Sequence, residues 1–401
     1  MKKIVMLSVL VIIGVLFSAQ IKRGGLSLLI LIDSVRPPEK AVMGKFIDGP
    51  TKTKVTVQSR GRIIHADLYR PYQHGRLFPL LLVHGENSSG KDEEHLVLLA
   101  NNLARAGFLV LVPDLEGVKA LRVRITDAED IFQCFLYLSK AEHAGSRGGM
   151  MGIGFGAGPM LLASAEPRIR DKVGMVATVG GYYDLRNVLS FVLTGVYEYG
   201  GHRGYVRPDA SLRWMLAYKN LDLLRSPDDR EKLRKIIEKR NRYEVAAAES
   251  LALSLGPEGR AFHAFLVNTD QDRFAPLYEN LPLPVREYVY QLSPARAIKY
   301  ITASFIITHG IDDYSVPYTE SMRLADAVGD KNRVRLALLP QLMQSAPLEP
   351  SAGELYQRYV LGGWRLFTAI YELLEKGSME GQGTGSRGQK PEVRSQVPAE
   401  I

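Results

Sequence analysis

Residues 147–159 read Arg-Gly-Gly-Met-Met-Gly-Ile-Gly-Phe-Gly-Ala-Gly-Pro. A short apolar run followed by closely spaced glycines predicts a strand, a sharp turn and a helix, the form of a nucleophile elbow with the signature G-x-S-x-G. Gly154 stands where that signature has its serine. No Ser, Cys or Asp lies between Gly148 and Ala163, so a shift of register restores no nucleophile. The segment predicts the backbone of an elbow without its attacking group.

The same glycines are also compatible with a dinucleotide-binding turn. Such a turn needs a βαβ unit near the start of its domain and an acidic residue about 20 residues farther on, at the end of the next strand. Here the next strand is expected at Val173–Val179, and the carboxylate that follows it, Asp184, lies about 30 residues after Gly154. This spacing disfavours a dinucleotide site.

Residues 1–35 are expected to form an N-terminal membrane anchor or signal segment. Residues 4–21 are eighteen uncharged, mainly apolar residues, just long enough to span a bilayer. A cleaved secretion signal is the alternative, but cleavage after Ala19 would place Phe17 where a small residue is required. We therefore expect a membrane anchor through residues 4–21, with the soluble domain on the extracytoplasmic side.

Two questions about this terminus stay open. The charges on the two sides of the apolar stretch, Lys2-Lys3 and Lys22-Arg23, nearly balance, so the orientation is poorly determined. A second apolar run, Leu26–Ile32, is too short to span a membrane as a helix. It is expected either at the membrane interface or docked on the domain.

Charge and cysteine content disfavour several classes of protein. The formal net charge is +8, but the densest basic cluster, residues 232–242, is interleaved with glutamates and lacks stacking aromatics, which favours a solvated helix face over a nucleic-acid surface. The single cysteine, Cys134, lies in an apolar helical run, so no internal disulfide forms. No His, Cys or carboxylate cluster has metal-ligand spacing, so neither a metal nor a cofactor is expected.

Apolar runs alternate with helical patterns in two parts of the chain, residues 36–185 and 301–376. Continuous apolar runs such as Pro79–Val83 are typical of strands buried on both faces. The alternation predicts an α/β protein with a doubly wound, mainly parallel sheet that begins with an antiparallel hairpin. Strands are expected at 55–57, 63–68, 79–83, 108–112, 149–153, 173–179, 304–308 and 333–339, and helices at 95–106, 128–141, 157–165, 318–328 and 352–375.

Residues 186–300 interrupt this alternation with helical patterns and no convincing strand. The segment is too long for a loop, so we expect a helical cap inserted after the sixth core strand. It should pack over the carboxyl edge of the sheet and enclose a pocket lined by some of its tyrosines, because ligands of open α/β sheets bind at that edge. Residues 377–401 have too few apolar side chains to fold and are expected to form a disordered tail.

Four segments, in this order, resemble the α/β-hydrolase superfamily, and within it the dienelactone-hydrolase and peptidase-like branch. The resemblance covers residues 55–375 apart from the cap. It implies an α/β-hydrolase fold and a Ser, Asp, His triad in that chain order. In the last segment the aspartate four residues before the proline, Asp313, would be the triad acid. The segments are Leu82–Gly85, Gly152–Gly156, Gly180–Asp184 and His309–Pro317.

The triad histidine is the second missing group. The resemblance places it after Leu339-Pro340, at Gln344, whose amide cannot act as a base near neutral pH. His309 is the last histidine in the chain, so none follows Asp313. With glycine at position 154 and glutamine at position 344, we expect a pseudo-hydrolase that serves as a binding or scaffold module. The sequence does not identify a protein partner.

The backbone donors that would hold an oxyanion are expected to remain. In this fold they are the N–H after the nucleophile, here that of Phe155, and an N–H in the loop after the third strand, here that of Glu86 or Asn87. Backbone donors survive side-chain substitution, so a small-molecule carbonyl or anionic ligand could bind there under the cap. His84 and Gly85 would form the base of the same loop.

The loop after the third strand, residues 85–92, allows two other interpretations of the function. Ser88 or Ser89 could be a relocated nucleophile with His84 as the base and Asp313 as the acid, which would make the protein a serine esterase for small esters or lactones. The loop also matches G-x-x-x-x-G-K, but Asp92 stands where a P-loop needs Ser or Thr for magnesium. Loop capping by the serines, with His84 buttressing the backbone, is the plainer interpretation.

Overall fold

The computed structural model describes residues 2–72, 75–340 and 360–381; for residues 2–17, 210 and 379–381 it describes the backbone only. Its centre is an eight-stranded sheet with the order β1-β2-β4-β3-β5-β6-β9-β10. Strand β2 runs antiparallel to β1 and β4, and the other neighbouring strands of this sheet are parallel. The strands are β1 (Thr51–Ser59), β2 (Arg62–Arg70), β3 (Phe78–Val83), β4 (Phe108–Pro113), β5 (Gly148–Ile153), β6 (Val173–Val179), β9 (Ser304–Gly310) and β10 (Val334–Leu339).

Helices cover both faces of the sheet. Strands β3 and β4 are buried at every residue, because each face packs against its own layer of apolar side chains. One layer includes α4 and α5, and the other includes α1, α2 and α15. The mainly parallel sheet and the opening hairpin confirm the predicted α/β-hydrolase fold. The α-helices outside the segment between β6 and β9 are α1 (Lys2–Ser34), α2 (Glu94–Arg105), α3 (Glu116–Lys119), α4 (Ile125–Ser139), α5 (Ala157–Ser164), α13 (Thr319–Val328) and, from residue 363 on, α15 (Gly363–Gly381).

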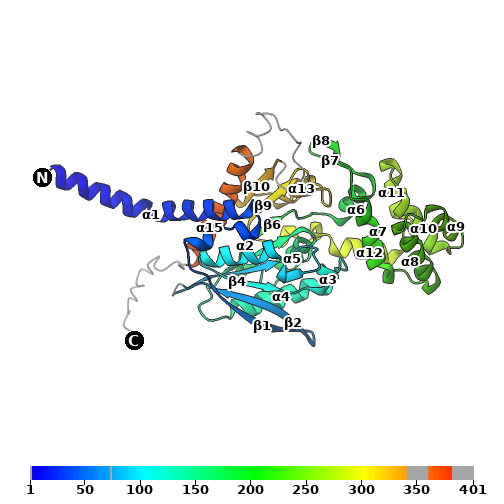
Figure 1. Ribbon diagram of the computed structural model, residues 1–401, viewed down its shortest axis with the longest axis horizontal. Helices are drawn as coiled ribbons and strands as arrows, with labels where there is room; N and C mark the ends of the chain where they lie inside the picture. Colours follow the sequence, from blue (N-terminus) through cyan, green and yellow to red (C-terminus); the bar gives the residue numbers. More distant parts are fainter. Residues whose placement is uncertain (1, 73–74, 341–359, 382–401) are drawn as a thin grey trace, which may run out of the picture.

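Between β6 and β9 the chain forms a mainly helical insertion. Its outer helices lie beside the sheet, at the end of the molecule opposite the N-terminus (Figure 1). The prediction of no strands here was wrong, because β7 (Val196–Tyr199) and β8 (His202–Tyr205) form a short antiparallel hairpin. The helices are α6 (Leu185–Thr194), α7 (Ala210–Lys219), α8 (Pro227–Asn241), α9 (Val245–Ala252), α10 (Pro257–Val267), α11 (Gln271–Glu279) and α12 (Leu283–Leu292).

Helix α1 has two parts with different surroundings. Its second half packs on α15 and α2, where Ile30 and Asp33 are buried and the Arg23 guanidinium lies 2.7 Å from the Glu375 carboxylate. The apolar run Leu26–Ile32 therefore docks on the domain. The first half projects away from the rest of the molecule (Figure 1).

Among the residues whose side chains the structure describes, no helix is long and apolar enough to cross a membrane. The expected span at residues 4–21 lies mostly outside those residues, so membrane anchoring stays a prediction. At the other end, α15 continues to Gly381, past the expected start of the tail at residue 377. Residues 382–401 lie outside the described part of the chain.

Candidate functional site

The elbow lies where strand β5 ends and helix α5 begins. Gly154 has a φ of +51°, in the left-handed region that glycine adopts without strain. The backbone thus has the sharp strand–turn–helix form that the sequence predicts. A Cβ atom added at Gly154 would overlap the carboxylate of Glu86, and one added at Gly156 would overlap the carbonyl oxygen of His84. A side chain at position 154 would therefore have to displace the Glu86 side chain.

The Glu86 side chain fills the space beside Gly154. It comes from the loop after β3, and its Oε2 accepts a hydrogen bond of 2.9 Å from the Phe155 N–H. That N–H is the oxyanion donor expected from the sequence, so the donor is engaged by the protein's own carboxylate. Burial raises the pKa of the Glu86 carboxyl and the nearby Asp313 raises it further, while the Phe155 N–H acts in the opposite direction.

Asp313 lies at the same edge of the sheet, in the loop after β9. Its Oδ1 accepts hydrogen bonds from the N–H groups of Ser315 (2.8 Å) and Val316 (3.0 Å). A Cβ atom added at Gly180, in the loop after β6, would lie 3.3 Å from Asp313 Oδ2. The structure therefore brings together the elbow, Glu86 and the expected acid loop. Gln344, the expected histidine position, lies outside the described residues.

Two histidines at this edge are buried and held by nearby groups. The His84 Nδ1–H donates to the Gly85 carbonyl (2.8 Å), and its Nε2 accepts from the Leu115 N–H (3.0 Å). Burial lowers the pKa of His84. His309 bonds through Nδ1 to the Ser321 hydroxyl (2.7 Å) and through Nε2 to the Val316 carbonyl (3.0 Å). These bonds fix both rings as supports of the loops.

The serines of the β3 loop are exposed. Ser88 and Ser89 lie on the surface, and the Ser89 N–H donates to Asn87 Oδ1 (2.8 Å) in a local turn. Because both ring nitrogens of His84 already have backbone partners, His84 is poorly placed to act as their base. Among the described residues, no group of three or more His, Cys, Asp or Glu side chains is placed to bind a metal ion.

A buried carboxylate that the sequence analysis did not single out anchors the loop after β6. Glu320, fully buried in α13, accepts hydrogen bonds from the N–H groups of Tyr183 (3.1 Å) and Asp184 (2.7 Å) and from Asn187 Nδ2 (3.0 Å). Burial raises the pKa of Glu320 to about 7, although these donors and Arg323 favour the charged form. Nothing in its sequence context marks this first-turn glutamate.

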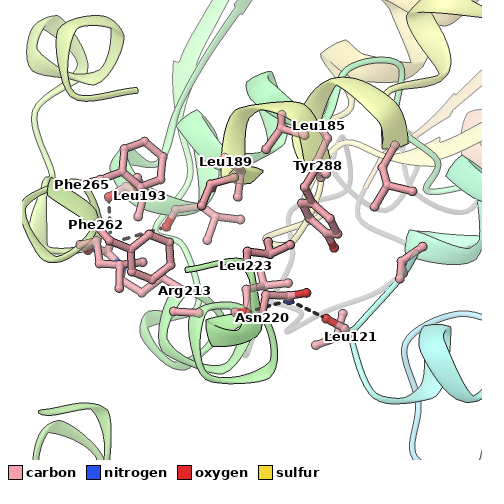
Figure 2. Close-up of a pocket in the computed structure, with 18 of the residues that line it drawn as sticks. Leu121, Leu185, Leu189, Leu193, Arg213, Asn220, Leu223, Phe262, Phe265 and Tyr288 are labelled. Atoms are coloured by element: carbon pink, nitrogen blue, oxygen red, sulfur yellow. Dashed lines mark hydrogen bonds between the residues drawn. The ribbon is translucent and has the colours of Figure 1, made fainter. Parts of the chain in front are cut away.

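An apolar cavity of about 70 Å³ lies between the insertion and the carboxyl edge of the sheet (Figure 2). Its core side includes Phe155, next to the elbow, and Tyr182, after β6. Of the tyrosines in residues 186–300, the lining includes Tyr288, whereas Tyr205, Tyr218, Tyr243, Tyr290 and Tyr300 are exposed on the surface. The insertion encloses a pocket, but leucine, valine and phenylalanine side chains line most of it.

No protein-family model and no curated protein matches the sequence. Among solved structures, Pyrococcus horikoshii acylaminoacyl peptidase is 15% identical with a TM-score of 0.48, over 86% of this chain and 44% of that chain. Est1E from Butyrivibrio proteoclasticus is 14% identical with a TM-score of 0.43, over 80% and 98%. A Pyrococcus furiosus esterase is 12% identical with a TM-score of 0.43, over 82% and 91%.

The chain thus spans less than half the length of the acylaminoacyl peptidase that it resembles. At these identities the likeness concerns the fold alone, and the fold assignment rests on the strand order described above.

Proposed function

We propose that this protein is a membrane-anchored pseudo-hydrolase, a binding module built on an α/β-hydrolase fold without serine-hydrolase catalysis. The observation that carries the proposal is the Glu86 carboxylate on the Phe155 N–H, beside Gly154. An oxyanion hole stabilises negative charge that develops in the transition state, and a carboxylate already bound there opposes that charge. Both the attacking group and the free donor are therefore missing from the place where the fold puts them.

The pocket beneath the insertion supports a binding role. It lies at the edge of the sheet where open α/β sheets hold ligands, and its lining is largely apolar. Phe155 connects the elbow with the cavity, because its N–H donates a hydrogen bond to Glu86 and the residue also lines the cavity. We therefore place a small organic ligand under the cap, where it is bound and not hydrolysed.

The first test is chemical labelling. We expect a fluorophosphonate probe to leave the purified full-length protein unlabelled, and p-nitrophenyl acetate hydrolysis to stay at the protein-free rate, because the elbow has glycine in place of the nucleophile and Ser88 and Ser89 in the described residues have no free base beside them. An active serine hydrolase run in parallel is the positive control. Labelling that disappears in Ser88→Ala or Ser89→Ala would instead support the serine esterase built on that loop, and robust turnover that survives both substitutions would overturn the proposal.

The membrane assignment rests on α1. Its second half is fixed to the domain through Ile30, Asp33 and Arg23, while residues 2–17 continue away from it as helix (Figure 1). An apolar stretch carried in this way could enter a bilayer without disturbing the core. The cap lies at the other end of the molecule and would then face away from the membrane, on the extracytoplasmic side in our proposal.

We expect the full-length chain, expressed in cells, to sediment with membranes and to resist extraction by alkaline carbonate. A chain without residues 2–17 keeps the docked half of α1, so it should fold and remain in the supernatant. Equal thermal unfolding of the purified domain in the two forms is the control for folding. A full-length chain that carbonate extracts completely would contradict the anchor and leave the binding role untouched.

A further inference from the structure

The cap has an open groove on its surface, which shares no lining residue with the cavity beside the elbow. The groove lies between α10 and the loop that joins α11 to α12, and its lining also includes Arg225, just before α8. Its volume is about 680 Å³, within the range of about 300–1,000 Å³ that is common for ligand-binding clefts. We call it the cap groove.

Most of the cap groove is lined by prolines, alanines and one leucine. Proline has no N–H, so this lining offers few backbone donors and recognition depends on side chains. Leu283 lies between two of the prolines and is 51% exposed, which makes it an apolar contact for a ligand in the groove. These residues are Pro257, Ala261, Ala264, Pro282, Leu283 and Pro284.

The two cationic side chains of the lining are free to bind an anion. Arg225 and Arg260 are exposed and form no ion pair with any residue that the structure describes. The Arg260 Nη1 donates to the Leu255 carbonyl (2.6 Å), which leaves the other donors of its guanidinium for a ligand. A planar guanidinium can bind a carboxylate through two parallel hydrogen bonds.

The carboxylates nearest to these arginines have other partners. Glu258 Oε2 accepts hydrogen bonds from the N–H groups of Arg225 (2.9 Å) and Ser226 (2.8 Å), just before α8. The buried Asp229 accepts from the N–H groups of Gly256 (2.7 Å) and Gly259 (2.9 Å), at the start of α10. The lining thus has two unpaired arginines against one engaged glutamate, and its charge favours an acidic ligand.

The position and openness of the cap groove indicate what kind of acidic ligand fits. Helices α10, α11 and α12 lie at the end of the molecule opposite the N-terminus (Figure 1), so the bilayer that holds residues 2–17 in our proposal does not reach the groove. Arg225, Pro257, Arg260 and Leu283 are all exposed, whereas a small-molecule site buries most of its ligand. An extended segment of polypeptide suits an open groove of this kind.

We propose that the cap groove binds an extended acidic segment of a partner protein. Carboxylates of the segment pair with Arg225 and Arg260, and an apolar side chain packs on Leu283. A single exposed ion pair contributes little to affinity, so the two arginines and the apolar contact act together. The inference rests on the proposed binding function and names the surface and the chemistry of the partner.

The test compares three five-residue peptides that carry the same dye and differ only in charge: Glu-Leu-Glu-Leu-Glu, Gln-Leu-Gln-Leu-Gln and Lys-Leu-Lys-Leu-Lys. Binding to the full-length protein in neutral detergent is measured by fluorescence anisotropy near neutral pH and at low salt. We expect the glutamate peptide to bind at least about tenfold more tightly than the glutamine peptide, and the lysine peptide to bind most weakly. Equal affinities, or no binding of the glutamate peptide, would overturn the inference.

Variants locate the site. The Arg225 side chain has no hydrogen bond or ion pair in the described part of the chain, so Arg225→Gln should fold and reduce the preference for the glutamate peptide severalfold. Arg225→Gln with Arg260→Gln should abolish it. Leu283→Ser should weaken the glutamate and glutamine peptides alike, because it removes an apolar contact and no charge.

Arg242→Gln is the matched control. Arg242 is an exposed arginine at the other end of α8, so its substitution removes the same charge outside the groove and should leave the preference unchanged. The control is needed because a net charge of +8 attracts acidic peptides to any part of the surface. If Arg242→Gln and Arg225→Gln reduce the preference equally, the attraction is general and the groove assignment is wrong.

Other occupants of the groove give different results. Binding of phosphatidylserine vesicles by the chain without residues 2–17, lost in Arg225→Gln and without a peptide preference, would assign the groove to lipid. Self-association in sedimentation velocity that Arg225→Gln removes would assign it to a second copy of this chain. Either result would overturn the inference.

Failure of the inference and failure of the proposed function are distinguishable. Ester turnover or fluorophosphonate labelling would refute the pseudo-hydrolase without changing the peptide ranking. An inactive protein that binds the three peptides equally would keep its proposed function and lose the acidic partner. Should Arg260→Gln fail to fold because the Leu255 carbonyl loses its donor, Arg225→Gln and the ranking on the unmodified protein decide.

Discussion

Replacing Glu320 by alanine is expected to lower the free energy of unfolding by about 3 kcal/mol. The substitution leaves the N–H groups of Tyr183 and Asp184 and the amide of Asn187 without their acceptor, and each buried unsatisfied donor costs about 1–3 kcal/mol. Urea unfolding near neutral pH measures the change. Glu116→Ala is the control, because that exposed carboxylate pairs with Lys119, which Asp114 also holds, and its loss should shift stability by less than about 0.5 kcal/mol.

The same carboxylate predicts a pH dependence. Its folded pKa of about 7 lies above the ordinary value of 4.5, so its contribution to stability is fully present below about pH 4.5 and is lost as the pH rises through 7. We expect the stability of the unmodified protein, relative to Glu320→Gln, to fall between pH 5 and pH 8. A difference that does not change between pH 5 and pH 8 would show that the folded carboxylate is charged throughout this range, held by its donors. A loss below about 1 kcal/mol in the alanine variant would contradict its anchoring role.

The loop after β6, which Glu320 holds, matters for the site because it connects the sheet to the cap. Asp184 begins helix α6, accepting from the Arg186 N–H (2.9 Å) and from the Ser293 hydroxyl (2.9 Å) at the end of α12. Glu320 holds the backbone of the same turn. The position of the cap over the cavity therefore depends on a few polar contacts as well as on apolar packing.

The core strands were predictable because each is a continuous apolar run between turn signals. Strands β3, β4 and β6 differ from the expected ranges by at most one residue at either end, since burial on both faces leaves no polar position to blur the pattern. The hairpin of β7 and β8 was missed because its strands have four residues each and none of these residues is buried. A signal existed: Gly200 and Gly201 both have positive φ and form the tight turn that such a pair favours.

Side-chain placement at the site could not be predicted in the same way. The sequence indicates that Gly154 and Asp313 share an edge, because loop order follows strand order in a parallel sheet. The sequence does not indicate which rotamer the Glu86 side chain takes, because that rotamer depends on the space that Gly154 leaves open at the elbow. The fold predicts a role only for the backbone N–H of Glu86, whereas the Glu86 carboxylate is the group that occupies the site. The number of tyrosines in the cap also does not indicate which of them line the cavity.

The occupied oxyanion donor changes what is needed to install catalysis. By the resemblance to the triad alone, Gly154→Ser with Gln344→His would supply the two groups that are substituted in this chain. In the structure, a serine at 154 would meet the Glu86 carboxylate and would be strained at a φ of +51°. We therefore expect either single substitution, and also the double, to leave p-nitrophenyl acetate hydrolysis near the protein-free rate, since triad members act as a unit.

Adding Glu86→Ala to that double is expected to raise the hydrolysis rate by about 100-fold over the double itself. Removing the carboxylate frees the Phe155 N–H, and one oxyanion donor is worth about 10²–10³ in rate. Glu86→Ala alone is the control and should stay at background, because it supplies neither nucleophile nor base. Asp313→Asn in the triple variant should abolish the gain, since the histidine then loses its orienting acid. If the double is as active as the triple, Glu86 does not block the site, and the lost triad groups alone explain the absence of catalysis.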